Sequence, residues 1–297
     1  RAYYVGITQT KILTVNSIVM LLSNVALNYC LIFGKGGFPA AGIAGAAIAS
    51  SVSEAVSLLF FIIYTSMTAD KRKYGFRRAF TLRPHLLKGM LSISGWTMVQ
   101  SFISVSIWFI FFLAIEHLGE RPLAVTNIVR NISALLIMVI SAFATTAGAL
   151  ISNQIGAGEQ RCLFKTCGMT LKLTYAILIP LLIILCLFPE SVLRAFTDSP
   201  SLIAASVNSV YVMASSTLIM APSFILFNAV SGTGNTRAGF IMEMISLAVY
   251  TAVIYYGIIR LKPDVALCWF SEHVYGVTLI FLAWWYLKSG KWRGKKV

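Results

Sequence analysis

The chain has 297 residues, of which 58% are hydrophobic and only 11% are charged, and its formal net charge is +14. Soluble domains carry about 25% charged residues, so this composition excludes a soluble protein and indicates a membrane protein with several spans. The positive charge does not indicate a nucleic-acid partner, because the basic residues lie between hydrophobic segments rather than on one folded face.

Hydrophobic segments recur along the chain at a length that suits transmembrane helices, since about 20 apolar residues cross a bilayer. We predict eight spans, near residues 12–33, 42–66, 91–115, 123–150, 165–188, 202–230, 239–259 and 265–287. Pro180 and Pro222 fall inside spans, which a bundle tolerates where neighbouring groups bond the freed carbonyls. The sequence therefore predicts an all-α polytopic membrane protein.

Lysine and arginine are distributed unevenly between the two sides of these spans. The segments before the odd-numbered spans, together with the C-terminal tail, hold 18 of the 24 basic residues, and the alternate segments hold five. The positive-inside rule then places both ends of the chain in the cytoplasm. We expect a multi-pass protein of the cell inner (plasma) membrane.

Two short stretches with the pattern Gly-x-x-amide-Thr-base open long apolar runs, GITQTK at residues 6–11 and GTGNTR at residues 232–237. Six predicted spans separate them, so both lie on one side and indicate a parallel repeat of six-helix lobes. We interpret them as matching cytoplasmic turns rather than as phosphate-binding loops.

The repeat predicts three segments within this chain. Residues 1–70 hold the last two helices of a truncated first lobe, residues 71–88 form a basic cytoplasmic linker, and residues 89–297 form a complete second lobe. Four further spans are then expected before residue 1. The linker has a second interpretation, as a contact with anionic lipid.

Three stretches in this order resemble the multidrug and toxic compound extrusion (MATE) family: GIAGAAIAS at 42–50, ISNQIGAGE at 151–159 and GTGNTR at 232–237. The likeness covers the whole chain, from the fifth to the twelfth helix of that fold. It implies two lobes around a central cavity that opens to one side at a time. It also implies a monomeric antiporter that exports small organic cations, driven by inward Na⁺ or H⁺, with no other cofactor. The alternative is a lipid-linked oligosaccharide flippase of the same superfamily, which Arg130 favours modestly.

Polar residues in the first two spans form a candidate cation-coupling site. Asn24 and Asn28 are four residues apart and share a helical face. The resemblance implies an amide and a carboxylate at these two places, so Asn28 departs from the family by giving an amide. Ser50 matches a hydroxyl of that site, and Glu54 would supply the charge that Asn28 lacks. The other interpretation of Glu54 is a hydrogen bond between helices.

Polar and aromatic residues inside the later spans are the candidates for a substrate cavity, because ionisable groups are rare and costly at membrane depth. We predict that the cavity is lined by Gln100, Trp108, Asn127, Arg130, Glu243, Glu272 and Tyr275. Sodium-coupled members of the family carry acids in the seventh and tenth helices, where this sequence has Ser104 or Val105 and Met220. That second-lobe cation site is therefore in doubt.

Arg130 is the most unusual residue of the set, because a guanidinium inside a span stays charged and calls for a carboxylate nearby. We expect Glu243 or Glu272 as its partner, either in a fixed ion pair or in a switch that opens during transport.

Other function classes fit the sequence poorly. It shows no paired acids at metal-binding spacing, no His-rich cluster and no nucleophile with its base, so we expect neither an enzyme nor a metal site beyond Na⁺ at the coupling site. It also lacks the selectivity-filter repeat of an ion channel.

Overall fold

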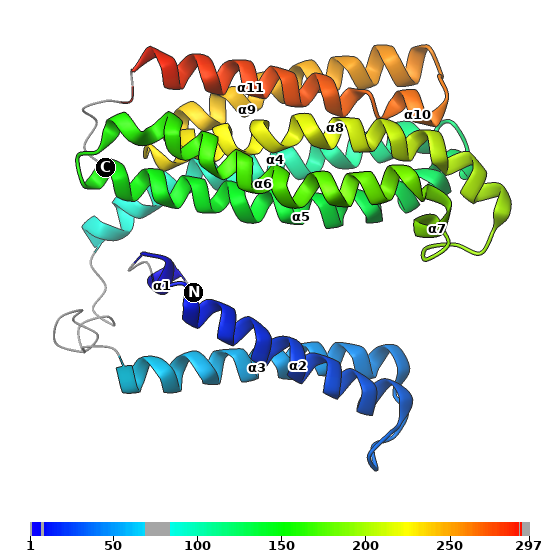
Figure 1. The fold of residues 1–297 in the computed structure, drawn as a ribbon, viewed down its shortest axis with the longest axis horizontal. Helices are drawn as coiled ribbons and strands as arrows, with labels where there is room; N and C mark the ends of the chain where they lie inside the picture. Colours follow the sequence, from blue (N-terminus) through cyan, green and yellow to red (C-terminus); the bar gives the residue numbers. More distant parts are fainter. Residues whose placement is uncertain (1, 7–8, 69–83, 291, 293–297) are drawn as a thin grey trace. The chain divides into compact units, whose positions relative to one another are not determined.

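The structure, a computed structural model, describes residues 2–6, 9–68, 84–290 and 292 (Figure 1). The regular elements in these ranges are all helical. The chain divides into two compact units, Arg1–Pro84 (unit 1) and His85–Val297 (unit 2). Two parts of the sequence predictions lie outside the described residues. They are residues 71–83, which make up most of the predicted linker, and Ile7 and Thr8 of the first repeat motif.

Unit 1 is a helical hairpin made of α2 (Lys11–Phe33) and α3 (Gly42–Thr68), preceded by the short α1 (Ala2–Gly6). Tyr4 of α1 is buried and its hydroxyl lies 2.7 Å from the Thr65 hydroxyl, which fixes α1 on α3. The hairpin packs tightly at Gly45, where an added Cβ would lie 2.5 Å from the Leu31 carbonyl oxygen. Glycine is therefore required there for the two backbones to approach.

Unit 2 is a bundle of long helices that lie side by side (Figure 1). Its long helices are α4 (Pro84–Glu116), α5 (Glu120–Gly156), α6 (Leu163–Leu187), α8 (Pro200–Gly232), α9 (Thr236–Val253) and α11 (Ser271–Ser289). Shorter pieces join them: η2, a 3₁₀ turn (Gln160–Cys162), α7 (Pro189–Leu193), η3, a π-helical segment (Ile254–Arg260), and α10 (Val265–Cys268).

In the described part of the chain, eight helical segments are long and apolar enough to cross a membrane, which confirms the eight predicted spans. Their bounds differ where polar residues extend a helix past its apolar stretch: α4 begins at Pro84 rather than 91, and α5 runs to Gly156 rather than 150. The last span is interrupted between α10 and α11, where Ser271 Oγ donates to the Cys268 carbonyl oxygen at 2.8 Å.

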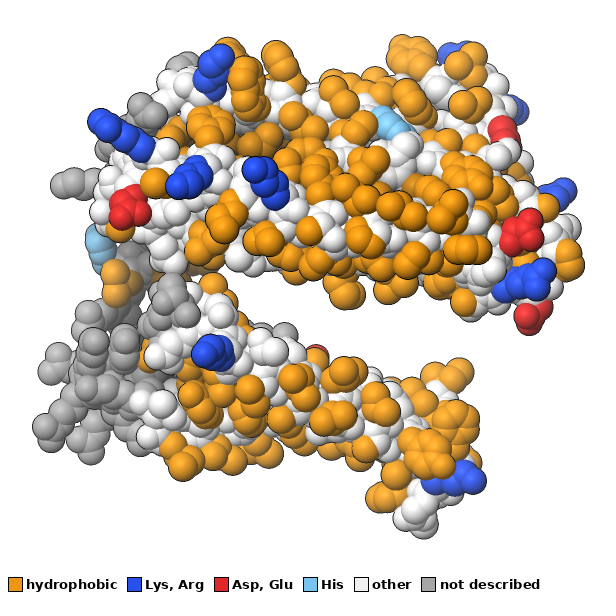
Figure 2. Space-filling view, viewed as in Figure 1, with side chains coloured by type: hydrophobic (Ala, Val, Ile, Leu, Met, Phe, Trp, Pro, Cys, Tyr) orange, Lys and Arg blue, Asp and Glu red, His pale blue; other side chains and the backbone are white. Residues whose placement is uncertain are grey.

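The surface of unit 2 has the charge distribution of a membrane-spanning bundle (Figure 2). Apolar side chains gather over its middle, and most charged side chains lie toward its two ends. Among the described residues, the end that carries the second repeat motif has Lys88, Arg161, Lys165, Arg237 and Lys288 with a single acid, Glu159. The other end has Glu116, Glu120, Glu190, Asp198 and Asp264 with Arg121, Arg194, Arg260 and Lys262.

The closest packing in unit 2 is between α5 and α8. A Cβ added to Gly232 would lie 2.5 Å from the Gly148 carbonyl oxygen, so the first glycine of the second repeat motif is where two backbones touch. Small residues are the usual means of close helix approach in membranes.

Pro222 lies inside α8 and cannot donate a backbone hydrogen bond to the Leu218 carbonyl. Tyr175 on α6 replaces that donor, since its hydroxyl donates to the Leu218 oxygen at 2.7 Å. An unbonded carbonyl in lipid costs several kcal/mol, so this contact satisfies α8 at its proline and attaches α6 to it.

We predict that Tyr175→Phe destabilises the protein by about 1–3 kcal/mol, because the Leu218 carbonyl loses its donor. The measurement is thermal unfolding of the purified protein in detergent. In a Pro222→Ala background residue 222 regains its N–H, so the same substitution should cost much less. Tyr256→Phe, at an exposed ring, is the matched control. Equal losses in the two backgrounds would contradict the assignment.

Candidate functional site

An acidic cavity of about 250 Å³ lies inside unit 2 between α4, α5, α8, α9 and α11. Four of the seven residues predicted from the sequence line it: Trp108, Glu243, Glu272 and Tyr275. The other residues that line it are Ser104, Val105, Ile137, Met220, Phe224, Leu247 and Tyr250. Its described lining therefore contains no Lys, Arg or His. The cavity is therefore aromatic and apolar with two carboxylates.

Glu243 on α9 is the more deeply buried carboxylate, with 3% of its surface exposed. Its Oε1 accepts hydrogen bonds from Ser104 Oγ at 2.8 Å and from the Tyr275 hydroxyl at 2.9 Å. Its Oε2 is buried without a partner, as is the hydroxyl of Ser246 one turn further along α9. Within the described part of the chain no basic side chain forms an ion pair with it, so its hydrogen-bond partners there are hydroxyls alone.

Glu272 on α11 is linked to Glu243 through two tyrosines. The Tyr250 hydroxyl donates to Glu272 Oε1 at 2.7 Å. The rings of Tyr250 and Tyr275 pack edge to face with centroids 5.8 Å apart. Sequence reasoning missed Tyr250, although its place seven residues after Glu243 puts it on the same face of α9.

Both helices that carry these groups are irregular beside them. α9 becomes π-helical at Ile254, four residues after Tyr250. The interruption between α10 and α11 comes directly before Glu272. π-helical segments and broken membrane helices are frequent at functional sites, which supports the choice of this cavity.

Arg130 does not form the expected ion pair, since within the described residues neither Glu243 nor Glu272 bonds to it. Its guanidinium lies over two aromatic rings of α4 instead, 5.5 Å from the Phe112 centroid and 6.0 Å from that of Trp108. Aromatic faces attract a cation through their quadrupole. In this conformation the partners of Arg130 are aromatic rings of α4 rather than a carboxylate.

The structure leaves the other predicted cavity residues outside the cavity. Asn127 and Arg130 are half-buried on α5 and do not line the cavity, although Arg130 lies over the ring of Trp108, which does. Gln100 is half-buried one turn before Ser104 on α4 and does not line it either. Val105 and Met220, which stand where sodium-coupled relatives carry acids, do line it. The acids of this cavity are thus on α9 and α11 instead.

Unit 1 brings three of its four predicted coupling residues together. Asn28 Nδ2 donates to Asn24 Oδ1 at 2.9 Å, and Asn24 Nδ2 reaches Ser50 Oγ at 3.5 Å. Asn28 Oδ1 is buried without a partner. Glu54 lies one turn after Ser50 on α3, with an exposed side chain. Amide and hydroxyl oxygens with a nearby carboxylate are suitable ligands for a hard monovalent cation.

Unit 1 also holds a buried polar pair that the sequence analysis did not single out. Asn16 Nδ2 donates to Ser57 Oγ at 2.8 Å, and both side chains are buried between α2 and α3. Asn16 lies two turns before Asn24 on α2, with Met20 between them. For a transition or divalent metal the described residues offer no group of three His, Cys, Asp or Glu side chains.

Comparison with known proteins agrees with this architecture. The model of the MatE family matches residues 97–256. The chain is 25% identical over 291 residues to the probable multidrug resistance protein NorM of Thermotoga maritima, covering 92% of this chain and 59% of that protein. It is 25% identical over 243 residues to the uncharacterized transporter YisQ of Bacillus subtilis, covering 78% of this chain and 50% of that protein. The chain thus spans little more than half the length of these relatives.

Solved structures share the fold. An outward-facing multidrug resistance MATE transporter superimposes with a TM-score of 0.80 at 16% identity, covering 93% of this chain and 61% of that one. The MATE transporter ClbM in complex with Rb⁺ superimposes with a TM-score of 0.78 at 18% identity, covering 97% of this chain and 64% of that one. The family match extends over more than half of the sequence, and the relatives are transporters rather than enzymes. The chain is a multi-pass membrane protein and belongs to the MatE family of transporters.

Proposed function

We propose that the protein exports small organic cations as a secondary antiporter, driven by Na⁺ or H⁺ moving inward. The observation that carries this proposal is the acidic cavity of unit 2, which combines two carboxylates and four aromatic rings with no basic residue in its described lining. The multidrug resistance proteins among its relatives support drug export as the activity.

The cavity matches the chemistry of an organic cation. Glu243 and Glu272 supply negative charge in a cavity with mostly apolar walls, where a charge pair is stronger than in solution. Trp108, Tyr250 and Tyr275 supply faces for cation–π contact with a quaternary or aromatic cation. Selectivity then rests on charge and aromatic surface rather than on many directed hydrogen bonds, which suits a polyspecific exporter.

The flippase alternative receives less support. A lipid-linked oligosaccharide carries phosphate, which calls for Lys or Arg in the cavity. The described lining contains neither, and Arg130 lies outside the lining, over the rings of Phe112 and Trp108.

The coupling site of this proposal is the polar group of unit 1, Asn24, Asn28, Ser50 and Glu54. Its amide and hydroxyl oxygens suit Na⁺, and Glu54 is the member that can also exchange a proton. In alternating access the coupling cation and the substrate stabilise different states, so each displaces the other. We place both chain ends on the cytoplasmic side of the plasma membrane, following the excess of basic residues there, and infer a monomer.

We predict that Glu243→Gln and Glu272→Gln each weaken binding of a cationic dye such as ethidium by about tenfold or more. Each removes a charge worth at least about 1.4 kcal/mol to a cation in a partly dry site. The measurement is a fluorescence titration of the purified protein, followed by efflux in cells. Glu159→Gln, an exposed carboxylate at the end of α5, is the matched control. Unchanged dye binding in both cavity variants would show that the cavity is not the substrate-binding site.

We predict that Glu54→Gln abolishes gradient-driven dye uptake into everted vesicles while dye binding in detergent stays at the wild-type level. The reason is that the variant loses the charge of the coupling site and keeps the cavity. Adding Asn28→Asp returns a carboxylate to the same polar group and should restore transport. Imposed Na⁺ and H⁺ gradients are compared separately, which identifies the coupling ion. Wild-type uptake by Glu54→Gln under both gradients would contradict this site.

A further inference from the structure

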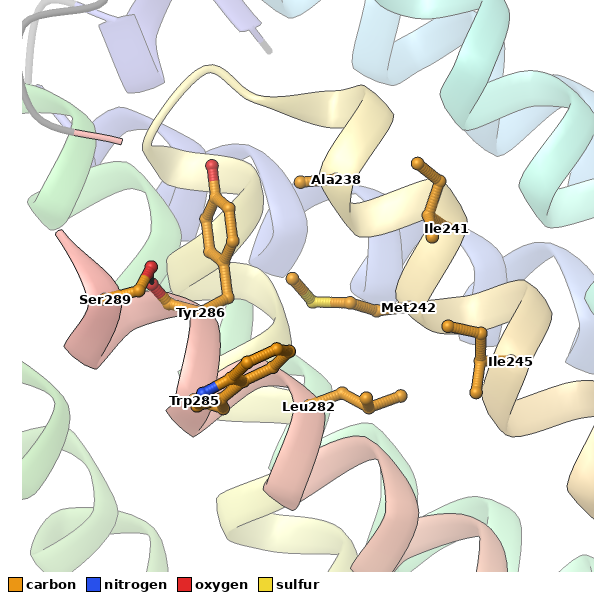
Figure 3. A pocket seen from close by; sticks show the side chains of 8 residues that line it. All are labelled: Ala238, Ile241, Met242, Ile245, Leu282, Trp285, Tyr286 and Ser289. Carbon is orange, nitrogen blue, oxygen red and sulfur yellow. Dashed lines mark hydrogen bonds between the residues drawn. The ribbon is translucent and has the colours of Figure 1, made fainter. Parts of the chain in front are cut away.

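A second cavity, of about 240 Å³, is a groove between α9 and α11 at the end of unit 2 that carries the Gly232–Arg237 motif (Figure 3). Its walls are almost entirely apolar and its polar groups are Tyr286 and Ser289. The remaining lining residues are Ala238, Ile241, Met242, Ile245, Leu282 and Trp285. The proposed export of organic cations makes no use of this groove.

The groove runs along α9 for about two helical turns. On α9 it extends from Ala238 to Ile245, which is seven steps of 1.5 Å, or about 10 Å of helix. Trp285 is 62% exposed in unit 2, and the exposed Ile241 and Ile245 line the facing wall. In a bundle that spans a bilayer, such an apolar surface contacts lipid tails.

One end of the groove is polar and built by the repeat motif. Asn235 caps α9, since its Oδ1 accepts a hydrogen bond from the Ala238 N–H at 3.3 Å. Its Nδ2 donates to the Tyr286 hydroxyl, which rises from α11 toward this turn (Figure 3). That bond uses the Tyr286 oxygen as acceptor, so its own O–H remains available to donate to an anion.

Two basic residues lie on the helices of the groove at the same end of unit 2. Arg237 lies one turn before Ile241 on α9, and its guanidinium is 5.8 Å from the Trp96 ring centroid. Lys288 lies one turn after Trp285 on α11, and its Nζ is 4.6 Å from the Trp284 ring centroid. A phosphate at the mouth of the groove would meet complementary charge.

We propose that this groove binds an acyl chain of an anionic phospholipid, with the lipid phosphate at the Tyr286 hydroxyl between Arg237 and Lys288. By the positive-inside rule the lipid comes from the cytoplasmic leaflet. The second repeat motif then has a role beyond its turn: Asn235 orients Tyr286, and Arg237 supplies charge. This site is separate from the acidic cavity and does not depend on the transported substrate.

Trp285 provides the test, because brominated lipid tails quench indole fluorescence on contact. The full-length protein is placed in vesicles that contain brominated phosphatidylglycerol or brominated phosphatidylcholine. The difference between wild type and Trp285→Phe isolates the signal of this residue. We expect brominated phosphatidylglycerol to quench Trp285 more strongly than brominated phosphatidylcholine does. Lys288→Gln should reduce this preference for phosphatidylglycerol about fivefold, which is the effect of one basic residue at the membrane surface. Tyr286→Phe should reduce it as well while keeping the ring.

Arg161→Gln is the matched control, because it removes one charge at the same end of unit 2 but from the turn before α6. It should leave the preference of Trp285 unchanged. Equal quenching of Trp285 by the two lipids in the wild type would overturn the proposal. An equal loss in Arg161→Gln and Lys288→Gln would also overturn it, since surface potential alone would then account for the preference. Size-exclusion profiles confirm that each variant is folded.

Discussion

The structure of unit 2 depends on how two carboxylates are held inside a membrane bundle. A buried carboxylate needs donors or an opposite charge, and in the described residues Glu243 and Glu272 have only hydroxyl donors. Those hydroxyls come from α4, α9 and α11, so satisfying the acids also fixes these three helices around the cavity. In the proposed export of organic cations, a bound cation would add the opposite charge that the hydroxyl donors do not provide.

The same requirement explains why tyrosine recurs between helices of this protein. Tyr175 bonds the carbonyl that Pro222 leaves free, and Tyr286 meets the amide that caps α9. Tyrosine suits these places because its ring packs in an apolar environment while its hydroxyl reaches the next helix. In each contact a polar group of one helix forms its hydrogen bond with a neighbouring helix rather than with water, because lipid offers no hydrogen-bond partner.

The sequence was sufficient to predict the spans, because a bilayer sets both the length and the polarity of a helix that crosses it. It was also sufficient to select Glu243, Glu272 and Tyr275, because a polar side chain inside a span is costly and tends to face the bundle interior. It did not indicate the aromatic partners of Arg130, because Trp108 and Phe112 lie on another helix. The contact between α6 and the Leu218 carbonyl was equally out of reach, since it depends on how α6 packs on α8. What pattern alone could not provide is the pairing of side chains across helices.

The backbone contact between Gly148 and Gly232 has a mechanical consequence. Two helices that touch through their main chains cannot slide past one another without a clash, so α5 and α8 must move as one stiff body. Any movement that widens the cavity then falls on α4, whose contacts run through side chains such as Ser104 and Phe111. It also falls on α9 and α11, where the π-helical segment and the interruption before Glu272 provide natural hinges.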